Sequence, residues 1–374
     1  MRPLLLYVCF ILLSAYIANC SFQMSFFKEL NKEKIKQNLI ISPLSAYQLL
    51  SLAANGAKEE TLTQMVLALG GKTLEELNKI NLQILSQVKQ FSTVEIANAI
   101  MTKFNPNSNF VAIGQKYGAS IQTLKSASQV NSWCNAKTHG KIKKIIDSLP
   151  DKVKMILLNA VYFKGFWSKQ FKKSLTMKKA FYNFNDKSKE KKVNRMEITD
   201  DFQYYEDKEV QLVKLPYKKD SMSAIVILPN EKKNINTFIS ELNDEKLQHL
   251  IKKMSGRKVR LELPKFELEY TSDLNGVLKK LGMEKPFNKY TANLLGIGKD
   301  LYIDEIIQKT YMKVDEEGTE AAAVTVIKGR PKPSAKRIPR IYPMIVNRPF
   351  LFLLKNDKLP LNNELLFMAK IEVL

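Results

Sequence analysis

The spacing of apolar residues changes partway along this chain, and that change limits the folds it can adopt. In the first half, apolar residues recur at intervals of three and four, as they do on one face of an amphipathic helix. This pattern predicts four helices, with a Ser-Pro pair before the first and a Gly-Gly pair after the second. The predicted helical segments are residues 42–56, 58–69, 73–91 and 127–146.

The second half has a different pattern, in which short β-branched or aromatic runs are separated by Pro, Asn and Gly. Runs of this kind predict strands. The predicted strands are residues 155–163, 210–215, 222–228, 259–263 and 350–354. Helices followed by strands favour an α+β fold with large, mostly antiparallel sheets. No internal repeat or flexible linker interrupts the pattern, so residues 21–374 are predicted to form one domain.

The first twenty residues differ from the rest of the chain. Arg2 precedes an apolar run from Leu4 to Ile17, and the short sequence Ala18-Asn19-Cys20 follows it. A basic start, an apolar core and a small-residue end are typical of a signal peptide. The run is too short to cross a bilayer as a helix, which needs about twenty apolar residues. We therefore expect residues 1–20 to be a signal peptide cleaved after Cys20, and the protein to be secreted and extracellular with no membrane partner.

That cleavage would leave Cys134 as the single thiol, so no internal disulfide is expected. Cys134 follows Trp133 on an apolar helix face, which favours a buried, unreactive thiol over a nucleophile. The chain has two histidines, His139 and His249, and it lacks a zinc-protease motif, a phosphate-binding loop and a dinucleotide fingerprint. We therefore expect no enzymatic activity, no metal and no cofactor.

The formal net charge of +22 favours polyanionic partners such as sulfated glycans. The positive charge is scattered along the sequence rather than concentrated in one block. The densest stretch, residues 169–195, mixes lysines with acids and aromatics, which indicates a solvated strand-and-loop face more than a dedicated site.

One segment does not fit the helix and strand patterns. Small and β-branched residues from Thr319 to Ile327 follow an acidic start, and the next thirteen residues contain six basic side chains, three prolines and no acid. Such a sequence cannot enter a core and is predicted to be exposed. A long loop of this kind within one domain is usually functional.

Five stretches of the sequence, in the same order and at similar spacing, resemble those of the serpin family. They are residues 38–45, 158–167, 316–322, 347–352 and 366–370. The resemblance spans nearly the whole mature chain. It implies a monomer with about nine helices, three β-sheets and an exposed reactive-centre loop, here the segment from Gly318 to Pro343. It also implies a single-use inhibitor, in which the cleaved loop inserts into the main sheet and traps the protease as an acyl-enzyme.

The resemblance assigns the hinge of the loop to eight consecutive residues. An inserting strand must place alternate side chains in a crowded interior, and Thr319, Ala321 and Ala323 are all small. Glu320 would then face outward, and Gly318 would give the backbone freedom to fold back into the sheet. The hinge residues are Glu316, Glu317, Gly318, Thr319, Glu320, Ala321, Ala322 and Ala323.

Other positions match family residues that control sheet opening. Ser42, Ser45 and Asn159 match the shutter beneath the main sheet, and Gln308 occupies a position where many members have a histidine. The amide of Gln308 can still donate and accept hydrogen bonds, but it cannot gate by imidazole titration. At the breach, where insertion begins, the resemblance implies Trp167 and Lys265, with Lys265 pairing with Glu316.

Family spacing from the hinge places the scissile bond after Lys332, but the next residue is proline, and trypsin-like enzymes cleave poorly before proline. The loop is a few residues longer than is common, which shifts the reactive bond toward Lys336 or Arg337. Arg337-Ile338 is the predicted bond, and the predicted target is a trypsin-like or dibasic-processing serine protease, with a cysteine protease as the alternative.

Two other functions stay open on the sequence. A non-inhibitory serpin, acting as a carrier, chaperone or storage protein, would keep the fold without trapping a protease. A polyanion-binding module would use the basic part of the loop as its contact surface, and this activity could coexist with inhibition.

Overall fold

The computed structural model describes residues 20–319, 340–359 and 363–374. Two groups of predicted functional residues lie outside the described residues, namely the hinge residues from Glu320 to Ala323 and the reactive-bond candidates Lys332, Lys336, Arg337 and Ile338. Most of the predicted signal peptide lies outside them as well.

The described part contains nine α-helices, the number that the family resemblance implies. Ser42, Thr73 and Ser126 accept hydrogen bonds from backbone N–H groups in the first turns of their helices, as N-cap residues do. The helices are α2 (Phe22–Glu33), α3 (Pro43–Ala54), α4 (Glu59–Ala68), α5 (Leu74–Val88), α6 (Ser108–Lys116), α7 (Ala127–Lys137), α8 (Ile235–Glu241), α9 (Asp244–Lys252) and α10 (Asn275–Lys280). Short 3₁₀ turns cover Lys173–Leu175, Asn183–Asn185, Lys187–Lys189 and Lys285–Phe287.

The predicted helix over residues 127–146 was too long. Helix α7 ends at Lys137, because His139 and Gly140 both adopt a positive φ that breaks the helical backbone. Ile142 and Ile145 are nevertheless buried, and they pack with α7 from an irregular segment. Their apolar spacing continued the helical pattern beyond the true end of the helix.

The larger sheet has nine strands and includes all the predicted strands except 155–163. Neighbouring strands pair in the order β1-β16-β15-β9-β8-β7-β10-β14, and β6 pairs with β7. Their bounds are β1 (Leu39–Ile41), β16 (Leu365–Ile371), β15 (Phe350–Asn356), β9 (Met222–Pro229), β8 (Val210–Pro216), β7 (Glu190–Glu206), β10 (Ser255–Pro264), β14 (Ile341–Ile345) and β6 (Met177–Tyr182).

A five-stranded sheet has the order β11-β12-β4-β2-β3. The adjacent inner strands β12 and β4 run parallel to each other. All nine residues of β4 are buried, as in strands that are covered on both faces. A third, two-stranded sheet pairs β5 (Gly165–Phe166) with β13 (Gly318–Thr319). The bounds in the five-stranded sheet are β11 (Phe266–Asp273), β12 (Glu305–Val314), β4 (Met155–Phe163), β2 (Val94–Thr102) and β3 (Ser120–Thr123).

The α+β class, the helix count and the three sheets agree with the sequence analysis, but the division into a helical half and a strand half does not. Strands β2 and β3 lie in the first half, and helices α8 to α10 lie in the second. These helices have at most nine residues, too few for a helical period to stand out.

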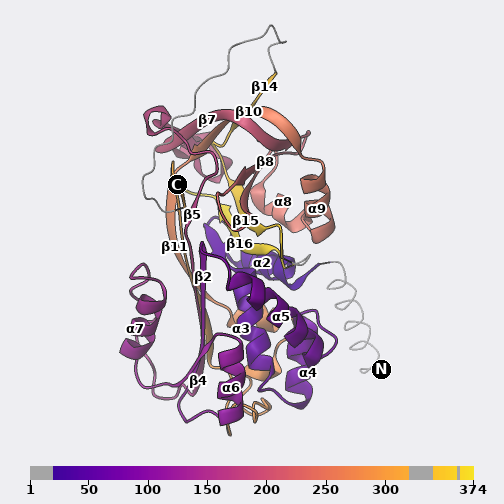
Figure 1. Cartoon of the computed structure of the whole chain (residues 1–374), viewed down its shortest axis with the longest axis vertical. Coiled ribbons are helices and arrows are strands. Elements are labelled where there is room, and N and C mark those ends of the chain that lie inside the picture. Colours follow the sequence, from indigo (N-terminus) through magenta and orange to yellow (C-terminus); the bar gives the residue numbers. More distant parts are fainter. Residues whose placement is uncertain (1–19, 320–339, 360–362) are drawn as a thin grey trace.

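Helices cover both faces of the five-stranded sheet. Helix α3 packs beneath β4 and β2, and α7 covers the opposite face, where Trp133 and Cys134 join a second hydrophobic cluster (Figure 1). Helices α4 to α6 gather at one end of the molecule, whereas β7, β8, β10 and β14 lie at the other (Figure 1). In the part of the chain that the structure describes, no helix combines the length and apolarity needed to span a membrane.

Candidate functional site

The predicted loop begins where the chain leaves the five-stranded sheet, through a tight turn at the end of β12. The backbone N–H groups of Glu317 and Gly318 donate to Asp315 Oδ1 at 3.0 and 3.3 Å, and Asp315 N donates to the Gly318 carbonyl at 2.9 Å. The chain then pairs antiparallel with β5, with Gly318 opposite Phe166. The root of the loop is therefore held across the end of the sheet rather than within it.

Gly318 occupies a position that has no room for a side chain. A Cβ atom there would lie 2.0 Å from the carbonyl oxygen of Gly165 and 2.7 Å from Phe166 Cα, and φ is +153°. Both obstructing atoms are backbone, so they cannot move aside as a flexible side chain could. Close packing is therefore a second requirement for glycine at this position, beside the conformational freedom expected from the sequence.

Trp167, the residue after β5, is hydrogen-bonded to the turn. Its indole Nε1–H donates to the Asp315 carbonyl at 2.9 Å, and its backbone N–H donates to the Glu317 carbonyl at 2.9 Å. The side chain is 1% exposed and stacks on Tyr217 with ring centres 4.3 Å apart. Trp167 thus holds the loop root by hydrogen bonds to main-chain carbonyls.

The predicted contact between Lys265 and Glu316 is present. Lys265 Nζ lies 2.7 Å from Glu316 Oε2, and Thr176 Oγ1 donates to Glu316 Oε1 at 2.7 Å. Burial of this carboxylate raises its pKa, but the hydrogen bonds from Lys265 and Thr176 outweigh burial and hold the pKa of Glu316 below its ordinary value. The glutamate is therefore anchored as a charged group.

The four predicted shutter residues meet in one buried network between α3 and the sheet. The backbone N–H of Ser42 donates to Gln308 Oε1 at 2.9 Å, and Gln308 Nε2 donates to the Ser42 carbonyl at 2.9 Å and to Asn159 Oδ1 at 2.7 Å. Asn159 Nδ2 donates in turn to Ser45 Oγ. All four residues are at most 1% exposed. Gln308 lies on β12 and Asn159 lies on β4, and these two strands pair in parallel. The network therefore spans the boundary between β4 and β12, which is called the seam below.

Two further residues of the same cross-strand row were not predicted from the sequence. Asn98 on β2 accepts a 2.6 Å hydrogen bond from Asn159, and Ser272 on β11 lies opposite Gln308. Four strands thus contribute one polar residue each at the same level of the sheet. Neither residue belongs to a local motif, and only the strand register brings them to the row.

Cys134 and His139, the cysteine and histidine that the sequence did not favour as catalytic groups, both make structural contacts. Cys134 is fully buried, and burial raises the pKa of its thiol to about 12, so the reactive thiolate is not formed near neutral pH. His139 is exposed, and its Nε2 lies 2.6 Å from Glu95 Oε1 on β2. This contact joins the segment after α7 to the sheet edge.

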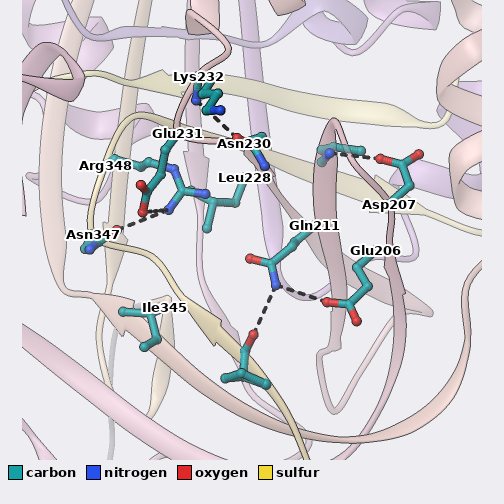
Figure 2. Close-up of a pocket in the computed structure, with 12 residues that line it drawn as sticks. Glu206, Asp207, Gln211, Leu228, Asn230, Glu231, Lys232, Ile345, Asn347 and Arg348 are labelled. Carbon is teal, nitrogen blue, oxygen red and sulfur yellow. Dashed lines mark hydrogen bonds and ion pairs between the residues drawn. The ribbon is translucent and has the colours of Figure 1, made fainter.

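A cavity of about 490 Å³ opens beside β14, the strand that follows the loop (Figure 2). Gln211 Nε2 donates to the Pro343 carbonyl at 3.0 Å and to Glu206 at 3.4 Å, which attaches the downstream end of the loop to β8. Arg348 donates through Nε to the Pro229 carbonyl at 3.0 Å and lies 4.0 Å from Glu231. The polar groups of this cavity anchor main chain on the downstream side of the loop.

Comparisons with known proteins agree with the geometry. Residues 17–373 match the family model described as Serpin (serine protease inhibitor). Iripin-8 of Ixodes ricinus is 32% identical over 368 residues, which cover 91% of this chain and 89% of that protein. Serpin B11 of Mus musculus is 30% identical, with 94% and 97% covered. The native-state crystal structure of the thermophilic serpin tengpin has a TM-score of 0.84 and 34% identity, covering 95% of this chain and 92% of that one.

Proposed function

The chain belongs to the serpin family, and from this premise we propose that it is a single-use protease inhibitor that traps its target by inserting its cleaved loop. Serpins are protease inhibitors rather than enzymes, which agrees with the absence of a catalytic motif from the sequence. The observation that supports the proposal best is the parallel pairing of β12 with β4 directly below the turn that leads into the loop.

This seam suits the entry of one additional strand. A strand that follows β12 through the turn at Asp315–Gly318 must run antiparallel to β12, and therefore also antiparallel to β4. Insertion would replace one parallel pairing with two antiparallel ones. Parallel pairing is slightly less stable per residue, so the exchange adds hydrogen bonds and improves their geometry. Cleavage is required first, because both ends of the intact loop are held, by β13 and by β14.

The chemistry of trapping uses the nucleophile of the protease. Its serine or cysteine attacks the carbonyl carbon of Arg337, the peptide bond to Ile338 breaks, and the new amine of Ile338 leaves with a proton. Arg337 is then held as an ester or thioester, and loop insertion carries the attached protease away before water attacks. About sixteen inserted residues at ~3.3 Å each would move it roughly 50 Å. Lys336 and Lys332 are the next candidates for the cleaved residue.

The breach and shutter contacts are proposed to control this insertion. Breaking the contacts of Trp167 and Glu316 would release the loop root, and separating Gln308 from Asn159 would open the seam. The side chains that enter the gap at Thr319, Ala321 and Ala323 are small, which supports an inhibitory member over a carrier, chaperone or storage protein.

We propose secretion of a monomer that begins at Ser21. In the structure, Ser21 is the N-cap of α2, and its backbone N and Oγ lie 2.5 and 2.8 Å from Asp244 on α9. Cleavage after Cys20 would place a positively charged amino terminus at this carboxylate. N-terminal sequencing of the protein recovered from the medium of secreting cells should therefore begin at Ser21. Retention inside the cell, or a different first residue, would contradict this proposal.

Polyanion binding is a second proposed activity, supported by a basic cluster at the downstream end of the loop. The guanidinium carbons of Arg340 and Arg257 lie 4.7 and 5.7 Å from the ring centre of Tyr342. We expect the affinity for heparin to fall steeply as the salt concentration rises. The affinity should be lower in Arg257→Gln than in the parent, and unchanged in Lys103→Gln, a substitution just after the last residue of β2. Equal weakening in both variants would exclude a site at this cluster.

The inhibitory function is tested by incubating the mature protein with trypsin-like, dibasic-processing and cysteine proteases. We expect a covalent complex on a denaturing gel and a released peptide whose mass corresponds to a start at Ile338. Thr319→Arg is expected to be cleaved at the same bond without trapping, because arginine cannot enter the sheet interior. The cleaved parent should also melt at a higher temperature than the intact protein. If every protease cuts the loop and stays active, the proposal is wrong.

A further inference from the structure

A groove of about 300 Å³ lies between helix α5 and the edge of strand β2. Side chains of α5, β2 and the segments next to them line it with apolar and polar groups in similar measure, and the volume lies at the lower limit of small-molecule sites. The walls include Leu85, Val88, Phe91, Val94, Ile96 and Tyr117.

One buried amide in the lining has no hydrogen-bond partner among the described residues. Gln48 on α3 lines it and is 1% exposed, and neither its Nε2 nor its Oε1 has a hydrogen-bond partner in the described part of the chain. An unpaired buried amide lowers the stability of a fold. A ligand that supplied a donor or an acceptor at this depth would offset that loss.

The charges around the groove favour an anion. Lys89 and Lys137 are exposed and form no ion pair within the described residues, and both line the groove. Glu95, the acidic residue in the lining, already contacts His139 Nε2 at 2.6 Å. The two lysines therefore provide positive charge that the groove does not neutralise.

We propose that this groove binds a small amphipathic anion, with a carboxylate or sulfonate at one end of an apolar body. The apolar body packs between Val88 and Ile96, the acidic group lies near Lys89 and Lys137, and a polar atom within the body pairs with the Gln48 amide. Hydrophobic walls with a few convergent polar groups are the usual composition of such sites.

The groove is also connected to the seam between β4 and β12. Asn98 lines it, and Asn98 Oδ1 accepts the 2.6 Å hydrogen bond from Asn159, which contacts Gln308. An inserted strand increases the distance between its two neighbours by about 4.8 Å. Helix α3 packs against β4, and Ser42 at its N-cap is hydrogen-bonded to Gln308 on β12, so insertion must shift at least one of these strands relative to the helix. A ligand that fits the present spacing between α3, α5 and β2 therefore stabilises the form without the inserted strand. This last step rests on the proposed inhibitory function.

Binding is tested with 1-anilinonaphthalene-8-sulfonate, an aromatic anion whose fluorescence rises in apolar surroundings, and dodecanoate as a competitor. In Gln48→Leu we expect the affinity for the dye to fall about tenfold, as expected from losing the hydrogen bonds of one amide. The same variant should melt at or above the parent temperature, because an unpaired buried amide has been removed. This opposite effect on stability separates loss of the site from loss of the fold.

Gln23→Leu is the matched control. Gln23 lies on α2, is also 1% exposed, has an equally unpartnered amide and does not line the groove. It should bind the dye like the parent, and Lys89→Gln with Lys137→Gln should bind more weakly than the parent with less dependence on salt. Equal dye affinity in the parent and Gln48→Leu, or equal loss in both glutamine variants, would overturn the site.

Coupling to the sheet is tested by titrating a protease that the protein traps with increasing amounts of inhibitor, at a saturating dye concentration. The number of inhibitor molecules consumed per protease trapped should rise for the parent and stay constant for Gln48→Leu at the same dye concentration. An unchanged number despite dye binding would refute the coupling and leave the site in place. If no variant traps any protease, the inhibitory function fails, and the fluorescence titration still decides whether the groove binds the anion.

Discussion

At the residue scale, Gly318 lies against backbone atoms that leave no room for a side chain. We expect Gly318→Ala to lower the free energy of unfolding by about 1–3 kcal/mol, because its Cβ would overlap the backbone of Gly165 and Phe166. Urea unfolding measures this loss. Gly256→Ala, where the nearest atom to the new Cβ lies 4.0 Å away, should change stability by less than about 0.5 kcal/mol. Similar effects of the two substitutions would show that the close packing at Gly318 is unimportant.

Glu316 gives a prediction about pH. The hydrogen bonds from Lys265 and Thr176 hold the pKa of Glu316 below its ordinary value, so the folded protein keeps this carboxylate charged at a lower pH than the unfolded chain does. Its contribution is therefore complete above the unfolded pKa of about 4.3 and is lost as pH falls through the folded value. In urea unfolding, the parent should be more stable than Glu316→Gln at pH 6, and this difference should shrink by pH 3.

Asp151→Asn in the exposed turn before β4 serves as the control for that measurement, with a difference near zero at both pH values. A difference between the parent and Glu316→Gln that stays constant from pH 6 to pH 3 would mean that the contact between Lys265 and Glu316 does not stabilise the charged carboxylate.

At the scale of the elements, the cross-strand polar row joins β2, β4, β12 and β11. Gln308→Met should destabilise the protein by about 2–4 kcal/mol, because Ser42 N, the Ser42 carbonyl and Asn159 Oδ1 lose their partner in a buried place. Ser272→Ala is the matched change in the same row. The Ser272 hydroxyl has no hydrogen-bond partner in the described structure, so its removal should be nearly neutral in urea unfolding. A nearly neutral Gln308→Met would mean that the network does not hold the seam closed.

Element prediction succeeded where a local pattern was long and regular. Helices α3 to α5 begin and end within three residues of the predicted bounds, and strand β4 has the predicted bounds. Strand β2 was missed because Glu95 and Asn98 interrupt its apolar run. Helix α7 was predicted too long because buried residues after Gly140 continued its spacing without its backbone conformation.

The candidate site was predictable only in part for a related reason. Ser42, Asn159 and Trp167 belong to sequence stretches that resemble the family, so they could be named from the sequence. Asn98 and the groove around Gln48 could not, because their meaning depends on contacts between residues far apart in the chain. Nothing in the sequence near Gln48 indicates that its amide would be buried without a partner.

At the scale of the whole molecule, the proposed inhibition requires the five-stranded sheet to open between β4 and β12. Val161 and Thr310 are partners across this seam, on the face opposite Cys134. Neighbouring strands lie about 4.8 Å apart, within the range of Cα separations that a disulfide can bridge. The double variant Val161→Cys, Thr310→Cys should therefore form a bond that locks the seam, and a reductant should remove it.

The most direct test compares the oxidised and reduced forms of this double variant with the same trypsin-like protease on a denaturing gel. We expect the oxidised form to be cut in its loop and to release active protease, whereas the reduced form should give a covalent complex. Because both forms have the same sequence, they differ only in the disulfide bond between β4 and β12. Equal trapping by the oxidised and reduced forms would contradict insertion between β4 and β12.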